Sequence, residues 1–79
     1  MKSECELAIV FDDGEKLAAA VRAVKQEQDF KKRSHSKITT SGKELRIKIT
    51  APDLVSLRAT INAYLRDLQI VENLDEIEV

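Results

Sequence analysis

The last third of the chain has the pattern of one long helix that is apolar on two opposite sides. Between Asp53 and Ile77, spacings of three and four residues place one set of apolar side chains along a single side. This first stripe consists of Leu54, Leu57, Ile61, Tyr64, Leu68 and Val71. A looser second stripe lies on the opposite side, because successive residues turn by about 100°. It consists of Ala59, Ala63, Ile70, Leu74 and Ile77.

Two opposed stripes are informative because a surface helix normally has one apolar side, which faces the core of its own domain. A chain of 79 residues has too few other elements to cover both sides. We therefore expect the first stripe to pack on the chain's own core and the second to meet a partner protein. The alternative is that the second stripe, with its two alanines and a frayed helix end, is ordinary surface scatter.

The small size of the chain favours association for a second reason. We expect one domain over residues 1–79, and a domain of this size is marginally stable without disulfides, a metal or a second subunit. Cys5 is the only cysteine, which excludes a disulfide within the chain. Cys5 and His35 are too few soft ligands for a structural zinc site, so we expect no metal and no cofactor. Oligomerisation is the remaining route.

The charge and the first residues of the chain indicate the cellular compartment in which we expect it. A net charge of −1 gives no overall field that would attract nucleic acid or acidic lipid. The first apolar run, residues 7–11, is too short for a signal peptide or a membrane span. A lone cysteine suits a reducing compartment. We expect a cytoplasmic protein.

Periodicity predicts five elements in the order β-α-β-β-α. Residues 5–11 alternate as a strand, and a helix over 14–27 begins at Asp12 and Asp13, with Glu15 completing an approximate capping box with Asp12. Residues 35–40 form a weak strand and 44–50 a clean one, joined by a turn in which Gly42 can take a positive φ. Thr50 is the expected N-cap of the last helix.

The simplest fold for this order is an α+β two-layer domain, in which a three-stranded antiparallel sheet carries both helices on one face. The other face is expected to be solvated; it carries Ala8, Val10, Lys37, Thr39, Arg46 and Lys48. The sheet has two edges, and an unprotected edge is a template for pairing with another chain. Edge-to-edge pairing is one route to a symmetric dimer.

No set of residues in the chain has the pattern of an active site. His35 begins a strand beside a basic run, Cys5 lies on the apolar face of a strand, and Asp12 and Asp13 are explained as a helix start. The two glycines, Gly14 and Gly42, cannot form a glycine-rich phosphate loop. We therefore expect that the chain is not an enzyme.

One basic cluster could hold a phosphate backbone: Lys31, Lys32, Arg33 and, close by, Lys37. The alternative is a solvated loop. No aromatic ladder accompanies the cluster, so base stacking is not supported, and the chain lacks the G-x-x-G loop of a KH domain. A stand-alone small RNA-binding domain stays open as a second interpretation.

Residues 51–71, APDLVSLRATINAYLRDLQIV, resemble the C-terminal helix of the small Pcc subunit of the KEOPS complex, in the family that includes the mammalian CTAG and LAGE proteins. The similarity rests on Asp53, on the segment 57–59 and on the segment 61–65, followed by an aliphatic stretch. The order of elements and the segment ELRIKITAPD also match, and the resemblance covers about residues 4–75.

The resemblance implies a non-catalytic subunit of a complex that installs threonylcarbamoyladenosine at position 37 of transfer RNAs that read codons starting with adenosine. A Pcc-type subunit forms a homodimer, or a heterodimer with a diverged Pcc-like paralogue. It docks the catalytic threonylcarbamoyl transferase subunit through a helical bundle and helps to hold the tRNA. No membrane is involved.

The resemblance also suggests which residues meet partners. In the last helix, Ala59, Ala63, Arg66, Ile70 and Leu74 are expected to face the catalytic subunit. Arg58 and Asn62 form a polar pair typical of the family, for which structural and interface roles are equally open. In the first helix, Ala19, Arg22 and Ala23 lie on the face where small residues allow another helix to approach, although alanine is also simply the best helix former.

Overall fold

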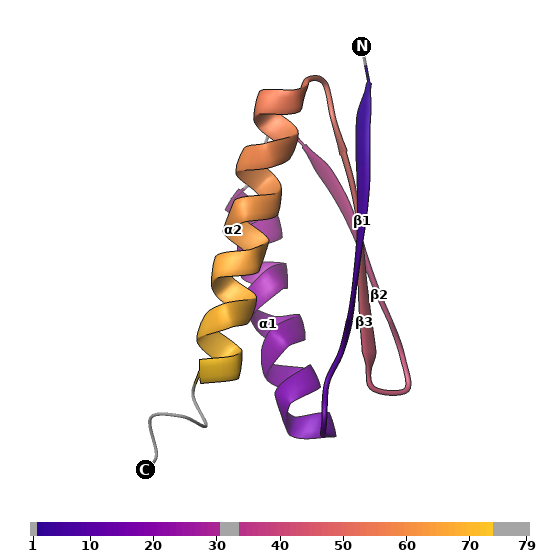
Figure 1. The fold of residues 1–79 in the computed structure, drawn as a ribbon, viewed down its shortest axis with the longest axis vertical. Coiled ribbons are helices and arrows are strands. Elements are labelled where there is room, and N and C mark those ends of the chain that lie inside the picture. The colour runs from indigo at the N-terminus through magenta and orange to yellow at the C-terminus, as the bar shows by residue number, and fades with distance from the viewer. Residues whose placement is uncertain (1, 31–33, 74–79) are drawn as a thin grey trace.

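Two helices lie against one face of a three-stranded antiparallel sheet in the computed structural model, which describes residues 2–30 and 34–73 (Figure 1). The strand order is β1 (Ser3–Val10), β3 (Glu44–Ala51), β2 (His35–Ser41), so β3 is central and the other two strands form the edges. The helices are α1 (Gly14–Phe30) and α2 (Leu54–Asn73). The predicted α+β fold is confirmed. Neither helix, over its described residues, is long and apolar enough to cross a membrane.

The element boundaries follow local chemistry, and of the predicted helix caps only that of α2 differs from the sequence prediction. Gly42 has a φ of 59° in the β2–β3 turn, as expected for the residue with no Cβ. Of the two aspartates expected to start α1, Asp13 is the cap, since its Oδ1 accepts a hydrogen bond of 2.8 Å from the Lys16 backbone N–H. Asp53, rather than Thr50, caps α2 in the same way, through Ser56 at 2.7 Å. Thr50 instead lies in β3, which runs on to Ala51.

The core lies between β3 and the two helices. Leu45, Ile47 and Ile49 of β3 are completely buried, together with Val24 of α1 and Tyr64 of α2. The first apolar stripe of α2 faces this core as predicted, with one exception. Leu54 is 64% exposed, because it occupies the first helical position, at the end of the sheet.

Polar contacts join α2 and α1 to the start of β2. Thr60 of α2 is a buried polar residue. Its hydroxyl donates to the backbone oxygen of Ser56 at 2.9 Å, and the Ser34 hydroxyl therefore donates to Thr60 at 2.8 Å. Tyr64 donates to the Ser36 hydroxyl at 2.7 Å, and burial raises the pKa of the phenol, which keeps it a neutral donor. These bonds join the flank of α2 that faces away from β1 to the start of β2.

Ala63 contradicts the prediction of an open second stripe, because it is only 3% exposed. The two helices pack against each other, and Ala63 lies on the side of α2 that faces α1 and the sheet. A small residue at this position allows that close approach. Ala63 is therefore part of the interior of the chain and is not available to a partner.

We expect Ala63→Glu to unfold the domain and Ala59→Glu to leave it folded. A carboxylate at position 63 would be buried without a partner, at a cost on the order of several kcal/mol. Ala59 is exposed, and a surface substitution changes the free energy of unfolding by about 0.5 kcal/mol or less. Urea titration followed by circular dichroism measures both. Equal stability of the two variants would contradict the placement of Ala63.

Candidate protein-protein interface

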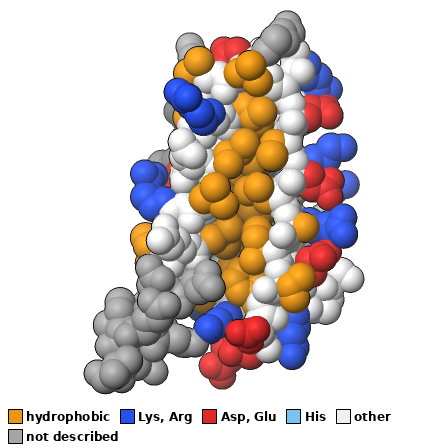
Figure 2. All heavy atoms as spheres, in the orientation of Figure 1, with side chains coloured by type: hydrophobic (Ala, Val, Ile, Leu, Met, Phe, Trp, Pro, Cys, Tyr) orange, Lys and Arg blue, Asp and Glu red, His pale blue; other side chains and the backbone are white. Residues whose placement is uncertain are grey.

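A continuous band of hydrophobic side chains runs along the molecule between α2 and β1 (Figure 2). On β1 the band contains Cys5, Leu7 and Ile9, which face the helices but are only half-buried. On α2 the flank beside β1 carries Leu54, Ile61 and Leu65, because Thr60 fixes the opposite flank on the β2 side. Leu65 is 46% exposed and Leu54 64%. We call these six residues the apolar band.

The band exists because α2 is the only one of the two helices that covers β1. In the described part of the chain α2 contacts β1, whereas α1 contacts only β2 and β3. β1 is also an edge strand, with β3 on one side and no described strand on the other. Exposed apolar side chains and an unpaired strand edge therefore lie next to each other, a combination typical of a protein-protein interface.

The sequence pattern does not single out Leu65, and this flank is not the one predicted to meet a partner. The available signal was the spacing of Leu54, Ile61 and Leu65, which share one side of a helix at steps of seven and four. These three residues become part of a larger apolar surface only because β1 lies beside that side of α2.

The outer side of α2 carries four of the predicted partner-binding residues. Ala59, Asn62, Arg66 and Ile70 are exposed and follow one another at steps of three and four, and Ile70 is 58% exposed. We call these four residues the outer face. Arg58 is exposed beside Asn62, toward the apolar band. Leu74 lies outside the described residues.

In α1 the structure separates the predicted residues. Arg22 is exposed, but Ala19 and Ala23 are half-buried and pack against the core. The alanine of this helix that is open to solvent is Ala18. Close approach of a partner helix at α1 is therefore more restricted than the sequence suggests.

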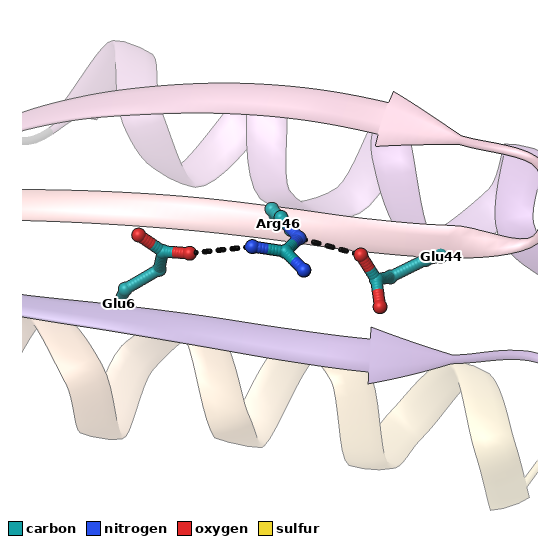
Figure 3. Close-up of polar contacts among 3 residues, drawn as sticks. All are labelled: Glu6, Glu44 and Arg46. Carbon is teal, nitrogen blue, oxygen red and sulfur yellow. Dashed lines mark hydrogen bonds and ion pairs between the residues drawn. The ribbon is translucent and has the colours of Figure 1, made fainter.

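The face of the sheet away from the helices is solvated, as predicted. Arg46 on β3 lies at its centre and bridges two carboxylates (Figure 3). Its guanidinium donates to Glu44 at 2.5 Å and to Glu6 on β1 at 3.0 Å. The hydrogen bond and negative charge of Glu44 raise the pKa of Arg46 most, and those of Glu6 raise it further. The charge of Arg46 is thus balanced within the sheet.

Two lysines lie side by side on the same face. Lys37 on β2 and Lys48 on β3 are directly opposite each other in the ladder, and both are exposed. No described acidic side chain forms an ion pair with either, although Glu6 lies opposite Lys48 in the β1–β3 ladder. A hollow of about 200 Å³ lies beside them, lined by Glu6, Lys37, Thr39, Arg46 and Lys48. Lys31, Lys32 and Arg33 lie outside the described residues.

The described residues contain no group of His, Cys, Asp and Glu that could hold a metal ion. Cys5 is a free, half-buried thiol in the apolar band, and His35 is exposed at the start of β2. The surfaces found are thus an apolar band with an open edge, a mixed helix face and a basic pair.

Comparison with known proteins identifies the family. Residues 4–74 match the model of the Pcc1 family, described as transcription factor Pcc1. A search of curated protein sequences finds no significant match. A chain of the crystal structure of the binary complex Gon7-Pcc1 is similar in fold, with a TM-score of 0.79 at 12% identity over 98% of this chain and 96% of that one.

A second solved structure shares the fold more loosely. It is a C-terminal segment of the alpha subunit of aIF2 from Pyrococcus abyssi, with a TM-score of 0.51 at 24% identity over 91% of this chain and 46% of that one. The family match covers nearly the whole chain and agrees with the resemblance in the last helix. The chain therefore belongs to the Pcc1 family and is a Pcc-type, non-catalytic subunit associated with the KEOPS complex.

Proposed function

We propose that this chain is the dimerising scaffold subunit of a KEOPS complex that makes threonylcarbamoyladenosine in tRNA. In this role it pairs with a second Pcc-type chain and docks the catalytic threonylcarbamoyl transferase subunit through its helices. It also helps the complex to bind tRNA, and the complex acts in the cytoplasm. The observation that carries the proposal is the apolar band beside the open edge of β1.

Pairing of β1 with β1 of a second copy would use both features at once. The backbone groups of the edge would be hydrogen-bonded, and the second copy would cover Leu54, Ile61 and Leu65. A single domain of this size gains stability from such cover. A diverged Pcc-like paralogue with a similar edge would serve in the same way.

The outer face of α2 is the proposed dock for the catalytic subunit. Ala59 and Ile70 give it apolar contact area, and Arg66 and Asn62 give it polar anchors. This face points away from the apolar band, so a dimer mate and the catalytic subunit can bind at the same time. Arg22 on α1 adds a further exposed cation on the helical side of the molecule.

The contact with tRNA is assigned to the basic residues around β2. Lys37 and Lys48 present two exposed ammonium groups on the solvated sheet face. Lys31, Lys32 and Arg33 precede the same strand in the sequence. A run of cations in the sequence suits a phosphate backbone, which binds without base recognition.

We expect Ile70→Glu to weaken binding of the catalytic subunit by about 30-fold or more, which corresponds to the loss of a buried anchor worth about 2 kcal/mol. The variant should stay folded, because Ile70 is 58% exposed. Thr39→Glu, which places the same charge on the far sheet face, is the matched control and should bind normally. Isothermal titration with the purified transferase measures both.

Unchanged affinity of Ile70→Glu would remove the outer face from the interface. Equal loss in both variants would indicate a general effect of added negative charge instead of a specific contact.

For tRNA, we expect the combined change of Lys31, Lys32, Arg33 and Lys37 to glutamine to lower the affinity of the assembled complex. The slope of log K against log salt should fall by about 0.7 to 0.9 for each phosphate contact removed. Lys43→Gln, in the exposed β2–β3 turn, is the control with one charge lost elsewhere. Filter binding at several salt concentrations gives the slopes.

The isolated chain should bind tRNA weakly in the same assay. Strong, salt-dependent binding by the isolated chain would favour a stand-alone RNA-binding domain over the scaffold.

A further inference from the structure

The carboxylate nearest to Lys48 in the sheet is bound to a different residue. Glu6 on β1 and Lys37 on β2 are both directly opposite Lys48 of β3, so the three residues form one row across the solvated face. Opposite charges on neighbouring strands normally pair. The Glu6 carboxylate instead reaches diagonally to Arg46, at 3.0 Å, and no described carboxylate forms an ion pair with Lys48. The Lys48 ammonium group therefore keeps its charge for another ligand.

Arg46 binds two carboxylates at once because of its place in the ladder (Figure 3). Its Nη1 donates to Glu6 on the neighbouring strand, and its Nε donates to Glu44, two residues earlier in β3. A planar guanidinium presents several donors, and its bonds to carboxylates are stronger than bonds between neutral groups. Arg46 thus draws the Glu6 carboxylate out of the row of Lys48 and into its own row.

The hollow of about 200 Å³ on this face has the lining of an anion site. Glu6 and Arg46, which are bonded to each other, form one part of the lining, and Lys37, Thr39 and Lys48 form the rest. The last three residues are exposed, and together they can donate hydrogen bonds from two ammonium groups and one hydroxyl. The hollow has the volume of about seven water molecules, which is enough for a partly hydrated phosphate group.

The lining also indicates which class of partner suits the hollow. None of the described residues that line it is apolar or aromatic, whereas charged residues are depleted at the core of protein-protein interfaces. Nucleic acid phosphates are bound by lysine, arginine and hydroxyl side chains, which position the strand without reading its sequence. A backbone phosphate of RNA therefore fits this lining better than an acidic protein segment does.

We infer that Lys37 and Lys48 bind one backbone phosphate of the RNA in this hollow, and that Arg46 is a positioning residue that keeps Glu6 away from Lys48. The inference rests on the proposed tRNA binding and specifies one contact within it. The Thr39 hydroxyl completes the site as a third donor. Arg46 does not touch the phosphate; it binds the carboxylate that would otherwise neutralise Lys48.

Neutralising Lys48 tests the phosphate contact. We expect Lys48→Gln to weaken tRNA binding by the assembled complex and to lower the slope of log K against log salt by about 0.7 to 0.9, which corresponds to one lost phosphate contact. Lys43→Gln removes the same charge in the exposed β2–β3 turn and should leave the slope unchanged. Filter binding at several salt concentrations measures both.

Two backgrounds test the positioning role of Arg46. In the wild-type background Arg46 binds Glu6, so we expect Glu6→Gln to change the tRNA affinity little. In an Arg46→Gln background Glu6 is free to pair with Lys48, and Glu6→Gln should raise the affinity by about 2- to 5-fold, the range that one exposed ion pair supplies. That gain should vanish when Lys48 is also changed to glutamine.

Glu4→Gln is the matched control for the removed carboxylate. Glu4 lies on the same strand and the same face, pairs with Lys2 at 3.6 Å and does not line the hollow. Its removal should have the same effect in both backgrounds. An equal effect of Glu6→Gln in both backgrounds would indicate simple addition of charges and would overturn the positioning role of Arg46. Circular dichroism checks that each variant is folded.

Inorganic phosphate tests the site without tRNA or the other subunits. Titration of the full chain with sodium phosphate, against sodium chloride at equal ionic strength, should shift the NMR amide signals of Thr39 and Lys48. Lys48→Gln should abolish the shift at Thr39. A shift at Thr39 that is absent from the wild type, or that persists in Lys48→Gln, would overturn the phosphate site, as would an unchanged salt slope in that variant.

These results separate the site from the proposed function. A complex that binds tRNA normally in every variant would overturn the site and leave the scaffold role in place. A complex that does not bind tRNA at all would overturn the proposed tRNA binding, and the phosphate titration would still decide the site. Loss of transferase binding in Lys48→Gln, with the tRNA slope unchanged, would assign the hollow to a protein partner and overturn the inference.

Discussion

α2 alone covers the inner face of β1, and this shortage of helix on one side of the sheet governs the rest of the molecule. The central strand is completely buried at Leu45, Ile47 and Ile49, whereas Cys5, Leu7 and Ile9 of β1 are only half-buried. A third helix would require a longer chain. The uncovered residues therefore stay available as contact area, and the edge beside them offers backbone groups for bonding.

The molecule keeps its surfaces apart by a simple arrangement. The sheet has one face under helices and one in solvent, so the basic pair Lys37 and Lys48 lies on the opposite face from the apolar band. Within α2, the apolar band and the outer face point in different directions around the helix. The bonds from Thr60 and Tyr64 to the start of β2 fix the rotation of α2 about its axis. They therefore determine which of its side chains lie in the apolar band and which lie on the outer face.

The sequence was sufficient for the fold, because its signals are local. Alternation in residues 44–50, a glycine at the turn and a three-four spacing over α2 each predict an element without knowledge of its neighbours. The order of elements then leaves few layered arrangements. The cap of α1 was predicted only as one of two aspartates, and the cap of α2 was predicted three residues early, because more than one side chain before each helix could accept the bond and only the backbone geometry selects among them.

The interface was less predictable because it depends on distant contacts. Periodicity assigns residues to sides of a helix but does not say what covers each side. Ala63 was expected on an open side and is enclosed where the helices meet, whereas Leu54 was expected inside and is exposed beyond the end of the sheet. Thr60 is buried because Ser34, far away in the sequence, meets its hydroxyl. Such pairs become visible only when the chain is folded.

The two edges of the sheet differ in a way that limits growth. β2 is largely exposed and rich in serine and threonine, and it carries the exposed Lys37. Charged and polar edge strands discourage the stacking of further chains. If β1 closes on itself about a two-fold axis, both outer edges of the pair are β2 strands. The assembly then ends at two copies and does not extend into a filament. An edge strand with unpaired backbone groups is therefore compatible with a particle of defined size.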